Sequence, residues 1–216
     1  MRIFNCLQNS EDWDRLRSGR PTASNFDRIV TPAKGQYSTQ SVGYACELIA
    51  QRLGVYTEPP PSFWMEWGTE HEPIAVTAYE AITGRTTQAV GFVLPDDTDA
   101  FGGSPDRFIV DDGEPIRLLE VKCPKPETLI GYHIAGKLPD EYRAQVQGLL
   151  WITDLQVADF FAWHPELTPF LIEVERDEKY ITAISKAMAT FLGELARMEQ
   201  FVKPQTIEGA EVIYDD

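Results

Sequence analysis

The chain has few cysteines and no long hydrophobic run. Its three cysteines, Cys6, Cys46 and Cys123, are odd in number and far apart, which indicates a reducing compartment without a disulfide framework. Three thiols also cannot form a four-cysteine zinc or iron–sulfur site. No apolar stretch approaches the ~20 residues that span a bilayer, and residues 1–10 lack the apolar segment of a signal peptide. We therefore expect a cytoplasmic protein with no membrane partner.

Positive charge is also scarce. The chain has 19 Lys and Arg residues against 34 Asp and Glu residues, a net charge of −15. Nonspecific affinity for DNA comes mostly from Lys and Arg contacts to phosphates, so this balance is unfavourable for a protein that coats nucleic acid. The imbalance is uneven, because residues 1–35 hold six basic and four acidic side chains, whereas residues 166–216 hold five and eleven. The N-terminal part is therefore the part better suited to face DNA.

Length and composition indicate one folded domain over residues 1–216, since 43% of the residues are hydrophobic. Strands in the middle of the chain with helices on both sides predict an α/β fold with a central mixed sheet flanked by helices. We expect the acidic tail 207–216 to be loose. The predicted helices are 10–20, 22–30, 39–54, 65–84 (apolar face Ile74, Ala78 and Ile82), 128–135 (helix or turn), 139–153 and 177–201; the predicted strands are 87–93, 100–103, 108–110, 116–121, 157–163 and 169–175.

The most informative stretch is a predicted hairpin around Asp111-Asp112-Gly113, because an Asp-Gly turn between two β-rich runs is typical of hairpins. Folding the chain about Gly113 places Asp106 opposite Glu120, and strand alternation puts Glu120 and Lys122 on one face. Carboxylate oxygens are preferred ligands of Mg²⁺, and a lysine beside them can orient water. This pattern is typical of metal-dependent phosphodiester hydrolysis. On spacing alone, a surface hairpin with a cross-strand Glu/Lys pair fits equally well.

A wider set of motifs resembles the phage lambda-type 5′→3′ exonucleases, the alkaline exonuclease or viral recombinase branch of the PD-(D/E)XK nuclease superfamily. The resemblance covers residues from about 13 to 180 and implies a restriction-endonuclease-like core. The motifs, in the family's order, are Trp13-x-x-x-Arg17, Thr22-Ala-Ser24, Trp67-Gly68…Glu72, Ser104-Pro-Asp106, Glu120-Val-Lys-Cys-Pro124 and Tyr142-x-Ala-Gln-Val-Gln147.

The resemblance implies a Mg²⁺-dependent catalytic set in which the metal and Lys122 position and deprotonate the attacking water. Mn²⁺ would substitute for Mg²⁺, whereas Ca²⁺ would inhibit, because its looser coordination misplaces the nucleophile. Thr69-x-x-Glu72 also fits a helix capping box, so a structural role for Glu72 stays open. The implied metal ligands are Asp106, Glu120, Glu72 and the backbone carbonyl of Val121, and the implied catalytic side chains are Asp106, Glu120, Lys122, Glu72 and Gln145.

A second implied set would bind a terminal 5′ phosphate, whose extra negative charge suits a guanidinium, hydroxyls and helix N–H groups. On local sequence alone, Arg17 also fits a solvated helix charge, and the hydroxyls also fit helix-start or turn positions. Met65 is either an apolar wedge against the terminal base pairs or a core residue, and Lys34 is a candidate contact to duplex DNA. The implied phosphate-binding residues are Arg17, Thr22, Ser24, Ser104 and Tyr142.

The implied activity is digestion of the 5′-ended strand of linear duplex DNA to 5′-mononucleotides during recombination by single-strand annealing. The implied assembly is a ring-shaped homotrimer that acts on duplex DNA with a 5′-phosphate end, beside a single-strand annealing protein, in the cytoplasm of a bacterial host. Two alternatives are an endonuclease of the same fold and a non-catalytic module that binds DNA ends.

Overall fold

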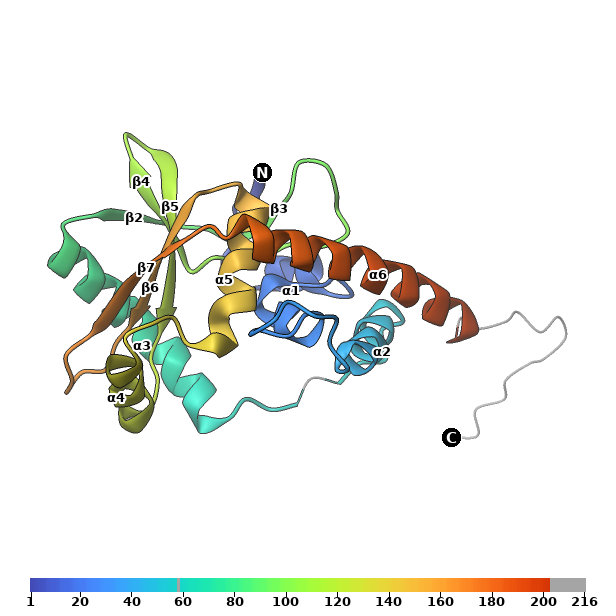
Figure 1. Cartoon of the computed structure of the whole chain (residues 1–216), viewed down its shortest axis with the longest axis horizontal. Helices are drawn as coiled ribbons and strands as arrows, with labels where there is room; N and C mark the ends of the chain where they lie inside the picture. Colours follow the sequence, from blue (N-terminus) through green and yellow to red (C-terminus); the bar gives the residue numbers. More distant parts are fainter. Residues whose placement is uncertain (58, 203–216) are drawn as a thin grey trace, which may run out of the picture.

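A mixed β-sheet lies at the centre of the computed structural model, which describes residues 1–57 and 59–202. Two of its strands are parallel neighbours, and the other neighbouring pairs are antiparallel. The expected mixed sheet flanked by helices is therefore confirmed (Figure 1). The expected tail 207–216 lies outside the described residues. In spatial order the strands are β2 (Thr86–Ala89), β4 (Arg107–Asp111), β5 (Glu114–Lys122), β6 (Val157–Ala162) and β7 (Phe170–Glu175), with β5 and β6 parallel.

Helices cover both faces of this sheet (Figure 1). None of the helices in the described ranges is long and apolar enough to cross a membrane. One face packs against α3 (Phe63–Thr83), and the other packs against α5 (Asp140–Thr153). The other elements are β1 (Arg2–Phe4), α1 (Glu11–Arg17), the 3-10 helix η1 (Ala23–Arg28), α2 (Ser41–Arg52), β3 (Phe92–Leu94), α4 (Pro126–Ala135) and α6 (Glu178–Val202).

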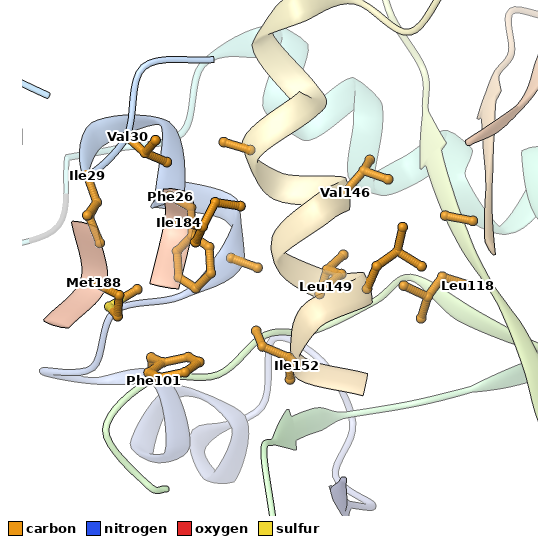
Figure 2. Packing of buried hydrophobic residues seen from close by; sticks show 14 of the residues in the cluster. Phe26, Ile29, Val30, Phe101, Leu118, Val146, Leu149, Ile152, Ile184 and Met188 are labelled. Carbon is orange, nitrogen blue, oxygen red and sulfur yellow. The ribbon is translucent and has the colours of Figure 1, made fainter. Parts of the chain in front are cut away.

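The larger hydrophobic core surrounds α5. Figure 2 shows Phe26 of η1 and Ile184 of α6 together on one side of α5, with Leu118 of β5 on the other side. Burial of each such side chain contributes about 2 kcal/mol. Gly148 lets η1 approach α5 closely, because an added Cβ would lie 2.4 Å from the Phe26 ring. This packing holds α5, which carries Gln145, firmly against the sheet.

The hairpin of β4 and β5 brings Asp106 opposite Glu120, as predicted, but through a different local geometry. Its turn is Asp112-Gly113, with both residues at positive φ (47° and 85°), as in a type I′ turn. A β-bulge then adds one residue to β5 and shifts the register, so that Arg107 pairs with Leu119. Continuing that pairing by one residue places Asp106 opposite Glu120. Without the bulge, Asp106 would face the neighbouring position, whose side chain points to the other side of the sheet.

Several predicted elements differ from the structure. The expected strand 87–93 is two strands, β2 and β3, which belong to different sheets. They separate around Gly91, where an added Cβ would lie 2.5 Å from the carbonyl oxygens of Phe4 and Cys6. The expected strand 100–103 is wrong, because Gly102 and Gly103 form only isolated bridges. The expected helix 22–30 is the shorter 3-10 helix η1.

A buried charge network joins α3 to the sheet on the side away from α5. Asp159 of β6 accepts a hydrogen bond from the hydroxyl of Tyr79 at 2.5 Å and is paired with Arg85. A guanidinium nitrogen of Arg117 lies 3.5 Å from its other carboxylate oxygen. The side chain of Asp159 is 2% exposed, so its charge depends on these partners.

We expect Asp159→Ala to lower the free energy of unfolding by about 3 kcal/mol, because it leaves buried donors without an acceptor. Asp159→Asn keeps an acceptor for Tyr79 and should lose clearly less. Chemical denaturation followed by circular dichroism measures both variants. Equal losses would contradict the importance of the Tyr79 hydrogen bond.

Candidate active site

A cavity of about 750 Å³ opens where β5 ends. Its walls come from α3, from the residue before β4, from the end of β5 and the loop after it, and from α4 and α5. It contains side chains from both predicted sets. The predicted residues that line it are Ser24, Met65, Glu72, Asp106, Val121, Lys122, Tyr142 and Gln145.

Glu120 lies beside this cavity and is 1% exposed. Lys122 Nζ and Gln145 Nε2 both donate hydrogen bonds to its Oε1 atom. Its Oε2 atom is buried and has no hydrogen-bond partner within the described part of the chain. Asp106 Oδ2 accepts a hydrogen bond from the backbone N–H of Val121 at 2.6 Å. The structure therefore brings Asp106, Glu120, Lys122 and Gln145 together, as the sequence predicts.

The pKa values of the three carboxyl groups at this site are raised above their ordinary values. Burial raises the pKa of Glu120 to about 8, and the neighbouring charge of Asp106 adds to the effect. Burial likewise raises the pKa of Glu72 to about 7, again with a contribution from Asp106. Burial also raises the pKa of Asp106 itself. A positive ion among these groups would favour their ionised forms.

The charged neighbours of Lys122 favour its ammonium form. Burial opposes its charge, but the nearby carboxylates of Glu120 and Asp106 raise its pKa above the ordinary value. Its Nζ atom also lies 5.2 Å from the centroid of the Tyr142 ring, in a cation–π contact. In its ammonium form, Lys122 can donate hydrogen bonds to water or to a phosphate.

The donor atoms of the site fit a magnesium ion. Among the residues that the structure describes, no three His, Cys, Asp or Glu side chains already meet as a metal centre. Mg²⁺ does not require this, because it usually takes one or two protein carboxylates and keeps water or substrate oxygens as its other ligands. The Oε2 atom of Glu120 has no hydrogen-bond partner among the described residues and could serve as a metal ligand. Asp106 Oδ1 and the Val121 carbonyl are further candidate donors at the cavity wall.

Glu72 reaches the cavity from inside α3, so the alternative interpretation of Thr69 and Glu72 as a capping box is wrong. The helix begins six residues before Thr69 and is capped by Ser62, whose side chain accepts a hydrogen bond from Met65 N. The apolar face expected from Ile74 and Ile82 is also wrong, since these side chains are 51% and 60% exposed. The buried residues of α3 are Ala75, Val76 and Tyr79, and Glu72 precedes them at the i−3, i−4 and i−7 positions of the same face.

The residues predicted to bind a 5′ phosphate form two pairs beside the cavity. In one pair, the Oγ atom of Ser104 lies 3.5 Å from Arg17 Nη1 and accepts a hydrogen bond from Trp13 Nε1 at 2.8 Å. In the other, the hydroxyls of Thr22 and Ser24 are 3.2 Å apart. Among these described residues, Ser24 lines the cavity, whereas Arg17, Thr22 and Ser104 are not among the residues that line it. Their role in phosphate binding remains a prediction.

The two predicted DNA contacts differ in position. Met65 lines the cavity and is 62% exposed, so its interpretation as a core residue is wrong. Lys34 is exposed and is not among the described residues that line this cavity. Its neighbour Gly35 packs against Tyr180 and Ala183 of α6. Whether Lys34 contacts DNA remains a prediction.

Other cavity residues are not indicated by the sequence motifs. Lys125 precedes α4, and its Nζ atom lies 5.3 Å from the ring centroid of Trp64 at the start of α3. Tyr132 of α4 donates a hydrogen bond to Glu141 at 3.0 Å. In the sequence, only their positions beside predicted site residues could have indicated Lys125 and Trp64, because Lys125 follows the Cys-Pro motif and Trp64 precedes Met65. Their meeting depends on how α3 and α4 pack.

The sheet topology and the buried Asp/Glu/Lys set at the end of β5 define a nuclease fold of the PD-(D/E)XK class. The alkaline exonuclease LHK-Exo from Laribacter hongkongensis has the same fold, with 32% sequence identity and a TM-score of 0.80 over 89% of this chain and 96% of that one. Its complex with dAMP matches with the same identity and TM-score over 90% and 96%. A phage-related exonuclease from Haemophilus somnus 129PT shares the fold at 14% identity, with a TM-score of 0.63 over 88% and 99%.

Residues 12–156 match the YqaJ-like viral recombinase domain. This match spans more than half of the chain and agrees with the likeness to the alkaline exonuclease. The chain belongs to the YqaJ-like viral recombinase family. No curated protein sequence matches it significantly. The family match and the likeness to the alkaline exonuclease confirm the resemblance found in the sequence motifs.

Proposed function

We propose that this protein is a Mg²⁺-dependent exonuclease that digests the 5′-ended strand of linear duplex DNA and releases 5′-mononucleotides. The observation that carries the proposal is the arrangement around Glu120, where Lys122 and Gln145 hold one carboxylate oxygen and the other has no partner in the described residues. The likeness to an alkaline exonuclease, also solved in complex with dAMP, supports the choice of a nucleic-acid substrate.

The side chains divide the catalytic work. A bound Mg²⁺ would supply Lewis-acid activation of water and of the scissile phosphate. Asp106 and Glu120, with Glu72 and the Val121 carbonyl, would hold one or two such ions. Lys122 and the metal would position and deprotonate the attacking water, and the ammonium form of Lys122 would stabilise the negative charge that develops on the phosphate. Gln145 Nε2 holds Glu120 in place, and its second N–H can donate to a phosphate oxygen, whereas Gln145 Oε1 can accept from water.

Membership of the viral recombinase family supports a proposal for the biological setting. We propose that the protein acts in recombination by single-strand annealing, as a homotrimer beside an annealing protein, in the cytoplasm of a bacterial host. Mn²⁺ should replace Mg²⁺, whereas Ca²⁺ should permit DNA binding without cleavage, because its coordination is longer and looser. Size-exclusion chromatography with light scattering tests the trimer.

The activity is tested with linear duplexes labelled at either end and with a closed circular duplex. With Mg²⁺, we expect the label at each 5′ end to appear as mononucleotide, and the circle to stay intact. With a chelator, both substrates should survive. Cleavage of the circle would favour an endonuclease of the same fold, and binding of ends without any product would favour a non-catalytic module.

Arg17→Ala should selectively impair digestion from ends that carry a 5′ phosphate. A hydrogen bond to a charged group contributes about 1.5–3 kcal/mol, which corresponds to about a 10- to 150-fold loss in kcat/KM on phosphorylated ends. Ends with a 5′ hydroxyl should be affected little. Arg15→Ala is the matched control, because Arg15 is an exposed guanidinium on the same helix, paired with Glu11 and Asp12. Equal losses on both kinds of end would remove the proposed role of Arg17.

A further inference from the structure

The face of α3 that borders the cavity continues beyond Glu72 toward the start of the helix. Trp64, Gly68 and Glu72 follow one another at intervals of four residues, so they lie along one stripe, and all three line the cavity. The rise of an α-helix puts Trp64 about 12 Å from Glu72 along the helix axis. The stripe therefore connects Glu72 to an aromatic side chain elsewhere in the cavity wall.

Gly68 keeps the middle of this stripe open. It lies inside α3, where glycine weakens a helix relative to alanine. Its Cβ would meet none of the described protein atoms within 4 Å, so packing within the chain does not require glycine here. A side chain at this position would instead occupy the space between Trp64 and Glu72. The absence of a side chain at Gly68 therefore leaves space in the cavity for a ligand that runs along the helix.

Trp64 offers an accessible aromatic surface at the end of this stripe. It is 38% exposed, and the ammonium of Lys125 lies 5.3 Å from its ring centroid. Trp67 and Phe63 contact it edge-on, with ring centroids at 6.0 Å and 5.1 Å, and help to hold the indole in place. A cation–π contact between partly exposed groups is weak, whereas a phosphate forms a stronger, charge-assisted hydrogen bond with an ammonium. A nucleotide would therefore draw Lys125 to its phosphate and leave the ring available for stacking.

We propose that Trp64 and Lys125 form a nucleotide-binding subsite for an unpaired nucleotide of the strand that enters the cavity. The base stacks on the indole of Trp64, Lys125 binds the adjoining phosphate, and the backbone crosses Gly68 toward Glu72. Stacking on an aromatic side chain suits any base, since each base has a π-face. The subsite thus serves a substrate of arbitrary sequence. This inference rests on the proposed function, because it extends the cavity assigned to DNA cleavage.

The test measures binding without turnover. Duplexes with two unpaired, 5′-phosphorylated nucleotides at one end are titrated by fluorescence anisotropy with a chelator present, and matched duplexes carry abasic residues at the two positions. We expect Trp64→Ala to weaken binding of the base-bearing end about 10-fold and to leave binding of the abasic end nearly unchanged. Trp64→Phe should recover most of the loss. Lys125→Ala should weaken both ends to a similar extent.

Control variants separate this role from damage to the fold. Ile74→Ala alters an exposed side chain on α3 that does not line the cavity, and Lys137→Ala removes an exposed lysine in the segment after α4. Both should bind like the parent. Gly68→Ala should strengthen α3 against thermal unfolding and still weaken binding of the base-bearing end.

Three results would overturn the subsite: equal losses by Trp64→Ala on base-bearing and abasic ends, no recovery in Trp64→Phe, or unchanged binding by Gly68→Ala. The proposed nuclease function fails in a different way, through absence of products from the parent with Mg²⁺. Base-dependent binding through Trp64 would then still stand.

Discussion

Replacing Lys122 by alanine is expected to reduce nucleotide release with Mg²⁺ by about 10²- to 10³-fold, because the variant loses the ammonium that stabilises developing charge on the phosphate. Binding of a phosphorylated duplex end should change little. The assay is release of labelled mononucleotide from a linear duplex, beside an anisotropy titration of the same DNA. Lys137→Ala, which removes an exposed lysine, is the matched control.

Removal of Lys122 also leaves Glu120 without its cationic partner, so a loss of stability could be mistaken for a loss of catalysis. Lys122→Arg keeps the charge and serves as a second variant. It should remain folded and lose activity, because the planar guanidinium cannot reproduce the position of the ammonium. A Lys122→Ala protein as active as the parent with Mg²⁺ would show that the assignment of Lys122 is wrong.

Glu120→Gln is expected to reduce activity by about 10³-fold or more, because it removes a carboxylate from the proposed metal site. It should also abolish the rise in melting temperature that Mg²⁺ causes in the parent. The amide keeps the size of the side chain and an acceptor for Lys122 and Gln145. Glu11→Gln, which neutralises an exposed carboxylate on α1, is the control. The same Mg²⁺-induced shift in the variant and the parent would exclude Glu120 as a ligand.

The raised pKa values of Glu120 and Glu72 predict that the melting temperature, and its response to Mg²⁺, depend on pH. In the metal-free protein, the contribution of Glu120 and Glu72 to stability is complete below their ordinary pKa of 4.5 and is lost as the pH rises through about 7 and about 8. The metal-free parent should therefore become less stable over this range, and Glu120→Gln should flatten the decline. Mg²⁺ competes with protons for these groups, so its stabilising effect should increase with pH. Melting temperatures with and without Mg²⁺ measure both effects, and a decline that is as steep in Glu120→Gln would contradict the assignment.

The pairing of Asp106 with Glu120 and Lys122 was predictable because it depends on contacts that are close in sequence. An Asp-Gly turn joins the two strands, and the period of two fixes which side chains share a face. The central sheet was also predictable, since most strands lie in the middle of the chain with helices on both sides. The register was correct only because a bulge in β5 offsets the position of the turn, and the sequence carries no clear signal for that bulge.

The faces of α3 were not predictable in the same way. Ile74 and Ile82 make a convincing apolar stripe in the sequence, yet the helix turns Ala75, Val76 and Tyr79 toward the sheet. Small side chains permit the close packing of α3 on β5, and the hydroxyl of Tyr79 reaches Asp159. That rotation decides the direction of Glu72. It depends on the shape and charge of the partner surface and not on the periodicity of α3 alone.

The sequence by itself determined the class of protein, the hairpin that carries Asp106, Glu120 and Lys122, and the motifs of the family. Only the tertiary structure decided that Glu72 and Gln145 reach these residues from opposite sides of the sheet, and that Trp64 meets Lys125 across the cavity. The physical reason is the distance along the chain between the residues that interact. Strand alternation and turns act between near neighbours in the chain, whereas the cavity exists because helices distant in sequence bury their apolar faces on the same sheet.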